Sequence, residues 1–299
     1  VPVLRNPGEP PRLVLKLPHT PQGVASLRRQ ERALAALHAD ARLAGWTARV
    51  AETVATGTIS GRFYLVETAL RGRAAIPARL DPATRDALLT AAAAAIGTLH
   101  TRTAAAVQVD AVRLARWVDA PLQVLGGVVA RLPAGRVYRA ALRRLRAELH
   151  ATLAGRTLAT SRIHGDFWPG NLLVAGRQVT GIVDWERAGA DELPLHDLLH
   201  LLLFTRQQIY GHDEADVIAA LGKGICWSAT DRALLRAAQR ALPGDLLAER
   251  PMALLYWLRH MAATLTLLPE YGRNRAYLLS HVEPVLQALA REPVGGRAP

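Results

Sequence analysis

Three side chains that offer oxygen ligands lie close together in the sequence: Asp166, Asn171 and Asp184. Between the last two, short apolar runs at 172–174 and 179–183 flank a turn that contains glycine. A tight antiparallel hairpin brings its two outer ends together, so this pattern predicts that Asn171 and Asp184 lie side by side. Asp166 comes five residues before Asn171, in a loop with proline and glycine, and we expect it to join them.

Two carboxylates and an amide at one place favour a particular chemistry. Hard oxygen ligands suit Mg²⁺, which takes one or two protein ligands and completes its shell with water and substrate phosphates. A carboxylate left over nearby can accept a proton from an attacking hydroxyl group. Together these roles describe phosphoryl transfer. The alternative is an ordinary loop and hairpin with capping polar residues, which the complete spacing of the set disfavours.

The histidines around this segment have simpler interpretations. His164 is expected to support the loop by packing and hydrogen bonding. His196 and His200 stand at helical spacing and suggest a metal pair, but the sequence offers no third ligand, so polar groups satisfied within a helix are favoured. Asp197 is either an acid favoured by a helix N-terminus or a buried acceptor for the backbone of the loop, and we favour the second.

The same residues carry a family resemblance. The segment His164-Gly-Asp-Phe-Trp-Pro-Gly-Asn171, followed by Ile182-Val-Asp-Trp-Glu186, resembles the aminoglycoside phosphotransferase and choline kinase-like family. The stretch 188–199 looks like the family's segment that leads to an aspartate at a helix start, and 65–72 is similar to its hinge between lobes. The resemblance covers most of 12–204, and its catalytic segment is the most specific part.

The resemblance implies an α+β, protein kinase-like two-lobe fold with ATP in the cleft. A small N-terminal antiparallel sheet lobe with one helix would span 1–70 and bind the nucleotide. A larger, mostly helical C-terminal lobe would span 71–299, with the catalytic loop at 163–186 and the acceptor site. The family places a phosphate-covering loop between its first two strands. Residues 2–5 look like the second strand, so the first strand and that loop have no counterpart in this sequence.

The resemblance also implies roles for single residues and two cofactors, ATP and Mg²⁺. Asp166 would be the catalytic base, and Asn171 and Asp184 would hold the Mg²⁺ ion. The acceptor would be a small molecule with a hydroxyl group.

On the N-terminal side, Lys16 would hold the α- and β-phosphates and Glu31 from the helix would orient it, with Glu52 and Glu67 as rival acids. The backbone around Glu67 and Ala69 would bond adenine. The rarity of lysine supports the phosphate-binding role of Lys16, because the chain has only two lysines among its 37 lysine and arginine residues. A lysine within a strand run is also unusual, although it can guard an exposed edge strand.

The elements that must position these residues follow from patterns of apolar residues and turn residues. In the first part of the chain, strands are predicted at 2–5, 12–17, 49–54 and 62–68, with a helix at 21–43. After residue 81 the pattern becomes helical, and helices are predicted at 82–100, 111–118, 137–154 and at four or more places after 195.

Composition limits the other possibilities. Half of the 299 residues are apolar and 21% are charged, which supports a packed core, and no apolar run is long enough to cross a bilayer. The first residues have no signal-peptide pattern. The single cysteine, Cys226, excludes an internal disulfide framework, so we expect a cytoplasmic setting.

The net charge of +12 comes from an arginine-rich composition. The densest basic cluster lies at 136–146 and has leucines at helical spacing, which favours an amphipathic helix with a solvated basic face. No zinc-finger spacing or RNA-binding motif accompanies it, so we expect no nucleic-acid partner. The sequence leaves the oligomeric state open.

Three functions compete. The small-molecule kinase is favoured. A protein kinase is disfavoured because Gly165 stands where protein kinases use arginine, and only nine residues separate Asp184 from Pro194. A catalytically impaired binding module would be expected to lose one of the three oxygen-bearing residues, and all are present. The acceptor stays open among aminoglycosides, macrolides, choline, sugars and amino acids.

Overall fold

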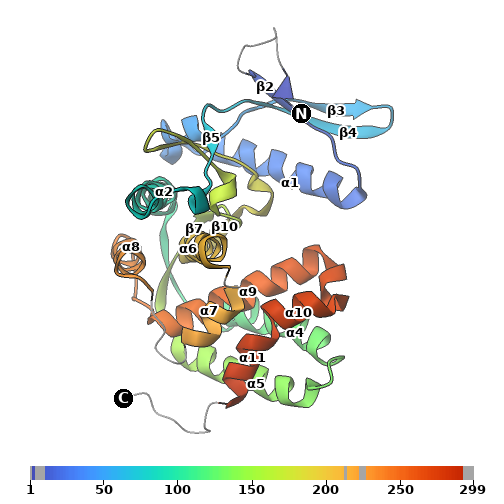
Figure 1. Ribbon diagram of the computed structural model, residues 1–299, viewed down its shortest axis with the longest axis vertical. Helices are drawn as coiled ribbons and strands as arrows, with labels where there is room; N and C mark the ends of the chain where they lie inside the picture. The colour runs from blue at the N-terminus through green and yellow to red at the C-terminus, as the bar shows by residue number, and fades with distance from the viewer. Residues whose placement is uncertain (1, 4–10, 212–213, 222–226, 292–299) are drawn as a thin grey trace. The chain divides into compact units, whose positions relative to one another are not determined.

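The computed structural model describes residues 2–3, 11–211, 214–221 and 227–291 (Figure 1). The strands are β1 (Pro2–Val3), β2 (Leu13–Lys16), β3 (Thr53–Ile59), β4 (Arg62–Thr68), β5 (Arg73–Ala74), β6 (Ala105–Gln108), β7 (Thr157–Ile163), β8 (Leu172–Ala175), β9 (Gln178–Ile182) and β10 (Gly189–Glu192). The α-helices are α1 (Pro21–His38), α2 (Pro82–Thr103), α3 (Ala111–Leu114), α4 (Ala120–Val129), α5 (Gly135–Leu153), α6 (Leu195–Tyr210), α7 (Glu214–Leu221), α8 (Ala229–Arg240), α9 (Glu249–Leu267), α10 (Arg275–His281) and α11 (Glu283–Arg291). The predicted α+β class is confirmed. None of the helices in these ranges is long and apolar enough to cross a membrane.

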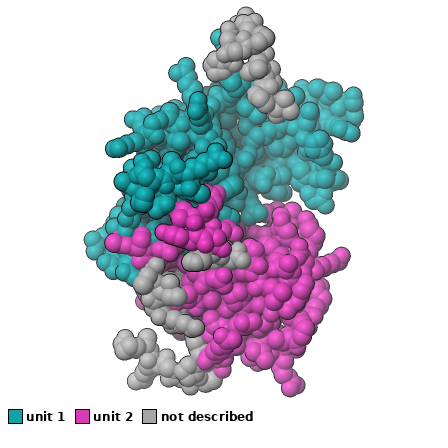
Figure 2. Space-filling model, viewed as in Figure 1, with its two compact units in different colours: residues 1–105, 159–205, 230–242 teal, residues 106–158, 206–229, 243–299 magenta. Residues whose placement is uncertain are grey.

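The chain divides into two compact units, coloured separately in Figure 2. Unit 1 combines residues 1–105, 159–205 and 230–242, and unit 2 combines 106–158, 206–229 and 243–299. Every predicted site residue belongs to unit 1. This division differs from the predicted lobe boundary near residue 70, which stays a prediction.

The first sheet of unit 1 is antiparallel, in the order β1-β2-β4-β3. Side chains of a strand point alternately to its two faces, and in β4 this places Phe63, Leu65 and Glu67 on the buried face. The register sets Lys16 on β2 opposite Leu65 on β4. Helix α1 contacts β3 and β4, so Lys16, Glu67 and the helix meet around one small core.

Two elements in the first part of the chain begin or end at least four residues from their predicted bounds. The helix predicted at 21–43 ends at His38, because the Asp40 carboxylate accepts a hydrogen bond from the Arg42 N–H at 3.2 Å and starts a separate 3-10 turn. The strand predicted at 49–54 begins only at Thr53, since Gly45 has a left-handed backbone, with φ 75°, and begins a 3-10 turn over 46–49.

The hairpin predicted around the oxygen-bearing residues is confirmed. β8 and β9 pair antiparallel from Leu172 with Ile182 to Ala175 with Gln178. β5 pairs with the other edge of β8. Asn171 therefore precedes one strand and Asp184 follows the other closely, as the spacing requires.

Unit 2 is mostly helical. α4 packs against α9, and α11 packs against α5 and α7. α5 buries leucines on one side, and Arg136, Arg139, Arg143 and Arg146 are exposed on the other, so the amphipathic basic helix is confirmed. Within this unit the Tyr138 hydroxyl donates to the Glu283 carboxylate at 2.6 Å.

Candidate active site

A buried carboxylate fixes the backbone of the loop that carries Asp166. Asp197 lies in the first turn of α6 and is fully buried. Its two oxygens accept hydrogen bonds from the N–H groups of His164 and Gly165, both at 2.8 Å, and the His100 ring nitrogen lies 2.9 Å away. Burial alone would raise the pKa of Asp197, but the hydrogen bonds with these neighbours lower it. The interpretation of Asp197 as a buried acceptor is confirmed.

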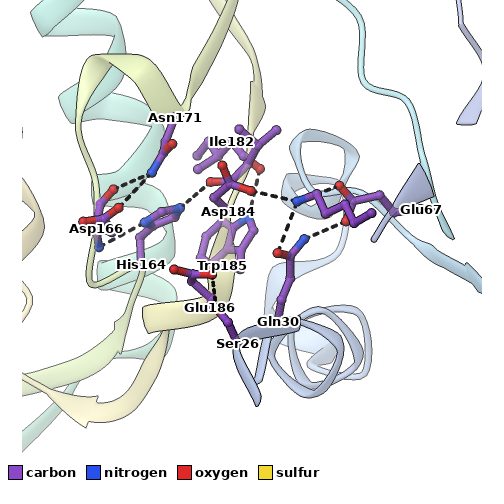
Figure 3. Close-up of polar contacts among 12 residues, drawn as sticks. Ser26, Gln30, Glu67, His164, Asp166, Asn171, Ile182, Asp184, Trp185 and Glu186 are labelled. Atoms are coloured by element: carbon purple, nitrogen blue, oxygen red, sulfur yellow. Dashed lines mark hydrogen bonds and ion pairs between the residues drawn. The ribbon is translucent and has the colours of Figure 1, made fainter. Parts of the chain in front are cut away.

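His164 supports the same loop. Its Nδ1 accepts a hydrogen bond from the Asp166 N–H at 3.2 Å, so its Nε2 carries the hydrogen and donates to the Val183 carbonyl oxygen at 2.8 Å. Its ring packs on Trp185, with ring centroids 4.5 Å apart. Burial lowers the pKa of His164, which agrees with a neutral, structural imidazole. These bonds join the two loops of the site (Figure 3).

Asn171 holds the Asp166 side chain in place. The Asn171 amide nitrogen donates to the Asp166 backbone oxygen at 2.9 Å and to its carboxylate Oδ2 at 3.2 Å (Figure 3). Asn171 ends a 3-10 turn at 169–171. Gly170 within this turn lies against the Trp168 ring, so close that a Cβ atom at position 170 would stand 2.3 Å from the ring.

Asp166 is kept ionised by the side chains around it. His200 Nε2 lies 3.3 Å from Asp166 Oδ1, and Arg187 Nη1 lies 3.9 Å from it. Burial would raise the pKa of Asp166, but the hydrogen bond from His200 and the nearby Arg187 lower it to about 2. The carboxylate can therefore accept a hydrogen bond from a hydroxyl group at neutral pH.

His200 is a residue whose relation to the site the sequence did not reveal. We predicted only a polar group satisfied within a helix, whereas its ring lies beside Asp166. The available signal was its spacing, because His200 follows Asp197 by three residues and residues three apart share a face of a helix. Its neighbour on the same face, His196, stacks on it with ring centroids 6.2 Å apart.

Lys16 and Asp184 come from distant segments of the sequence of unit 1 and lie side by side. Lys16 Nζ lies 2.7 Å from Asp184 Oδ1 and 3.1 Å from Glu67 Oε1. Burial lowers the pKa of Lys16, and the two carboxylates outweigh it, so the pKa is raised. Asp184 follows β9 with a left-handed backbone, φ 62°, and half of its side chain is exposed.

Glu31 does not take its predicted place. Lys16 Nζ instead donates to Gln30 Oε1 at 3.2 Å, and Glu31 Oε1 accepts a hydrogen bond from the Thr56 hydroxyl at 3.3 Å. Consecutive residues of a helix point about 100° apart, so only one of the two can face the lysine. The rival acid Glu67 provides the carboxylate that contacts Lys16.

The backbone groups predicted to bond adenine are engaged within the sheet region of the protein itself. The Ala69 N–H donates to the Arg12 carbonyl oxygen at 2.8 Å, so a base can use this donor only if that bond breaks. The Glu67 backbone lies inside the sheet, in register with Val14 and Thr53. It is the Glu67 side chain that reaches the site.

The donors around Asn171 and Asp184 fit a hard cation such as Mg²⁺. Because the Asn171 amide nitrogen is engaged with Asp166, its oxygen is left to act as a ligand. The Asp184 carboxylate is half-exposed and has a second oxygen besides the one that contacts Lys16. Two oxygen ligands from protein, with water and phosphate oxygens, suit Mg²⁺.

Comparisons with known proteins identify a family. A family model described as the phosphotransferase enzyme family matches residues 3–237. No curated protein matches the chain.

Solved structures show the same fold. An aminoglycoside-3'-phosphotransferase of type VIII is similar with a TM-score of 0.51 and 23% identity, over 87% of this chain and 93% of that one. A thermostable mutant of aminoglycoside phosphotransferase APH(4)-Ia, in its apo form, is similar with a TM-score of 0.55 and 17% identity, over 94% and 89%. The ADP-bound aminoglycoside phosphotransferase APH(2'')-Ib is similar with a TM-score of 0.53 and 13% identity, over 93% and 87%.

Proposed function

The chain belongs to the phosphotransferase enzyme family, and from this premise we propose that it is a small-molecule kinase that transfers the γ-phosphate of ATP to a hydroxyl group of an antibiotic or metabolite. The observation that carries the proposal is the convergence in unit 1 of Lys16 with Asp184 and of Asn171 with Asp166. These are the charges and oxygen donors that phosphoryl transfer needs.

In this proposal Asp166 is the base. It accepts the proton of the acceptor hydroxyl as that oxygen attacks the γ-phosphorus and the bond to the β-phosphate oxygen breaks. The bond from Asn171 and the loop held by Asp197 fix the direction of the carboxylate. Its lowered pKa keeps it ready to accept that hydrogen bond.

Asn171 and Asp184 would hold Mg²⁺, and Lys16 would bind the α- and β-phosphates as a point charge. The ion, when bound, supplies positive charge toward the phosphate oxygens. We also propose that residues 1–70 form the nucleotide-binding lobe and that 71–299 provide the catalytic loop and the acceptor site.

The acceptor class is the open part of the proposal. The similar structures are aminoglycoside phosphotransferases by name, which makes a polycationic antibiotic one candidate. The net charge of +12 does not favour a polycation, so macrolides, choline, sugars and amino acids stand beside it.

The test is ATP turnover with Mg²⁺ over a panel of these five acceptor classes, using the parent protein and Asp166→Asn. Asparagine keeps an oxygen for the Asn171 bond but is a poor base, so kcat should fall about 10²–10⁴-fold while nucleotide binding is retained. Turnover in the variant equal to that of the parent would remove Asp166 from the role of base. Nucleotide binding without turnover of any acceptor would favour the impaired binding module instead.

A further inference from the structure

Lys16 is surrounded by polar groups from three other elements. Its ammonium contacts Gln30 from α1 at 3.2 Å, Glu67 from β4 at 3.1 Å and Asp184 after β9 at 2.7 Å. The Gln30 amide nitrogen donates to the second Glu67 oxygen at 2.7 Å. Lysine, amide and carboxylate thus form a closed triangle. Figure 3 labels two of its members, Gln30 and Glu67.

Because this triangle is buried, each of its polar groups needs a partner within it. Glu67 is 4% exposed and Gln30 is 2% exposed. A buried carboxylate is costly unless it is paired and hydrogen-bonded, and here one oxygen faces the ammonium and the other faces the amide. The arrangement also fixes the amide of Gln30, because only its oxygen can face an ammonium and only its nitrogen can face a carboxylate.

Positions 67 and 30 differ in whether they can hold the carboxylate that pairs with Lys16. Glu67 lies on the strand next to the one that carries Lys16, so the sheet itself fixes their separation. Position 30 lies on the helix, and a carboxylate there would stand within hydrogen-bonding distance of Glu67. Two like charges so close in a buried site cannot both stay ionised, whereas a neutral amide bonds to both partners.

We infer that Glu67 is the charged anchor of Lys16 and that Gln30 is a positioning residue, which holds the two together from α1 without adding charge. This inference rests on the proposed function, because it assigns the lysine that would bind the phosphates. Without Glu67, the ammonium would keep Asp184 as its carboxylate partner among the contacts described here and would compete with Mg²⁺ for it. The helix acid expected from the family resemblance is replaced by a strand acid and a helix amide.

The test exchanges the two side chains. Glu67→Gln removes the anchor, and Gln30→Glu with Glu67→Gln restores one carboxylate and one amide in exchanged positions. The readout is the Kd for AMP-PNP with Mg²⁺ by calorimetry, with Glu52→Gln as the control because Glu52 is an exposed acid of the same region. We expect Glu67→Gln to weaken binding at least about tenfold, the exchanged double variant to recover most of the loss, and the control to bind as the parent does.

A second readout does not depend on nucleotide. Gln30→Glu alone places a second carboxylate near Lys16, Glu67 and, across the lysine, Asp184. The new carboxyl group at position 30 and that of Glu67 should together have a raised pKa in the folded state. The loss of folding stability should therefore grow as the pH rises. The melting temperature of this variant should fall further behind that of the parent from about pH 5 to about pH 8.

The outcomes separate the two proposals. If the parent protein binds no nucleotide, the proposed function fails, and the pH-dependent melting still decides whether position 30 must be neutral. If the parent binds and Glu67→Gln binds equally well, or if the exchanged double variant is no better than Glu67→Gln, the inference is overturned and the kinase proposal stands. If Glu67→Gln does not fold, recovery of the fold by the exchange supports the inference, and no recovery overturns it.

Discussion

At the scale of single residues, Lys16 shows why charge alone does not define a site. Its ammonium fits among Gln30, Glu67 and Asp184, with all three partners within 3.2 Å. An ammonium is a compact point charge, whereas the guanidinium of arginine is planar, larger and reaches further. The arginine-rich composition makes arginine the ordinary choice in this chain, and the structure gives a physical reason for the exception.

Lys16→Arg should therefore be damaging although it keeps the charge. The larger guanidinium cannot occupy the place of the ammonium without displacing Gln30 or Glu67. We expect kcat/KM for ATP to fall on the order of 10²-fold, the magnitude seen when a positioned donor is lost. Circular dichroism and the melting temperature should stay close to those of the parent. If the variant turns over ATP as the parent does, the compact shape of the Lys16 ammonium is not needed for phosphate binding.

At the scale of elements, the catalytic loop depends on a glycine. Gly165 has a φ of 80°, and a Cβ atom there would lie 2.2 Å from the Arg187 carbonyl oxygen. Because that neighbour is backbone, it cannot move aside cheaply. One of the two N–H groups that Asp197 binds belongs to Gly165 itself, so a shift of the loop would also move Asp166.

Gly165→Ala should lower both stability and turnover. We expect a loss of at least about 1–3 kcal/mol of unfolding free energy from the left-handed backbone, with the clash in addition. The matched control is Gly176→Ala in the β8–β9 turn, where φ is 60° and nothing lies within 4 Å of the added carbon. The control should lose only the unfolding free energy that the left-handed backbone costs, and it should keep its turnover. Equal losses in chemical unfolding and activity would show that the contact with Arg187 is unimportant.

The sequence could predict elements where the determining signal is local. Strand β4 and the start of α1 match their predicted bounds, because turn residues and the Thr20 cap, which accepts a hydrogen bond from the Gly23 N–H at 3.1 Å, stand beside them. The hairpin and its oxygen donors were predictable for the same reason.

Contacts between side chains on elements that are distant in the sequence were not predictable. Whether Gln30 or Glu31 faces Lys16 depends on how α1 is rotated against the sheet, and no neighbour in the sequence sets that rotation. The proximity of His200 to Asp166 likewise needs α6 to be placed first.

At the scale of the whole molecule, carboxyl groups in both units link stability to pH. In unit 2, Asp119 accepts hydrogen bonds from Arg146 at 2.8 Å and lies 2.9 Å from the His150 ring nitrogen. Burial would raise its pKa, but these neighbours lower it, as the pKa values of Asp166 and Asp197 are lowered in unit 1. A lowered pKa in the folded state means that the unfolded chain binds protons first as the pH falls.

The stability from these groups is therefore present above the ordinary pKa of aspartate, near 3.8, and is lost as the pH falls through and below it. Melting temperatures between about pH 7 and about pH 3 should fall steeply at the acid end. Asp119→Asn should melt lower than the parent at neutral pH, and the difference should shrink toward pH 3. A difference that stays constant with pH would mean that Asp119 acts through shape and not through charge.

The interleaving of the two units also bears on how the protein is made. Unit 1 needs residues up to 242, yet its first 105 residues leave the ribosome well before the stretch that carries Asp166 and Asp184. At about 5–20 residues per second, the first sheet waits on the order of ten seconds for its partners. During that interval its exposed edges and apolar face are open to other chains. Synonymous codon changes that slow translation between 105 and 159 should therefore lower the yield of soluble protein without altering a single residue.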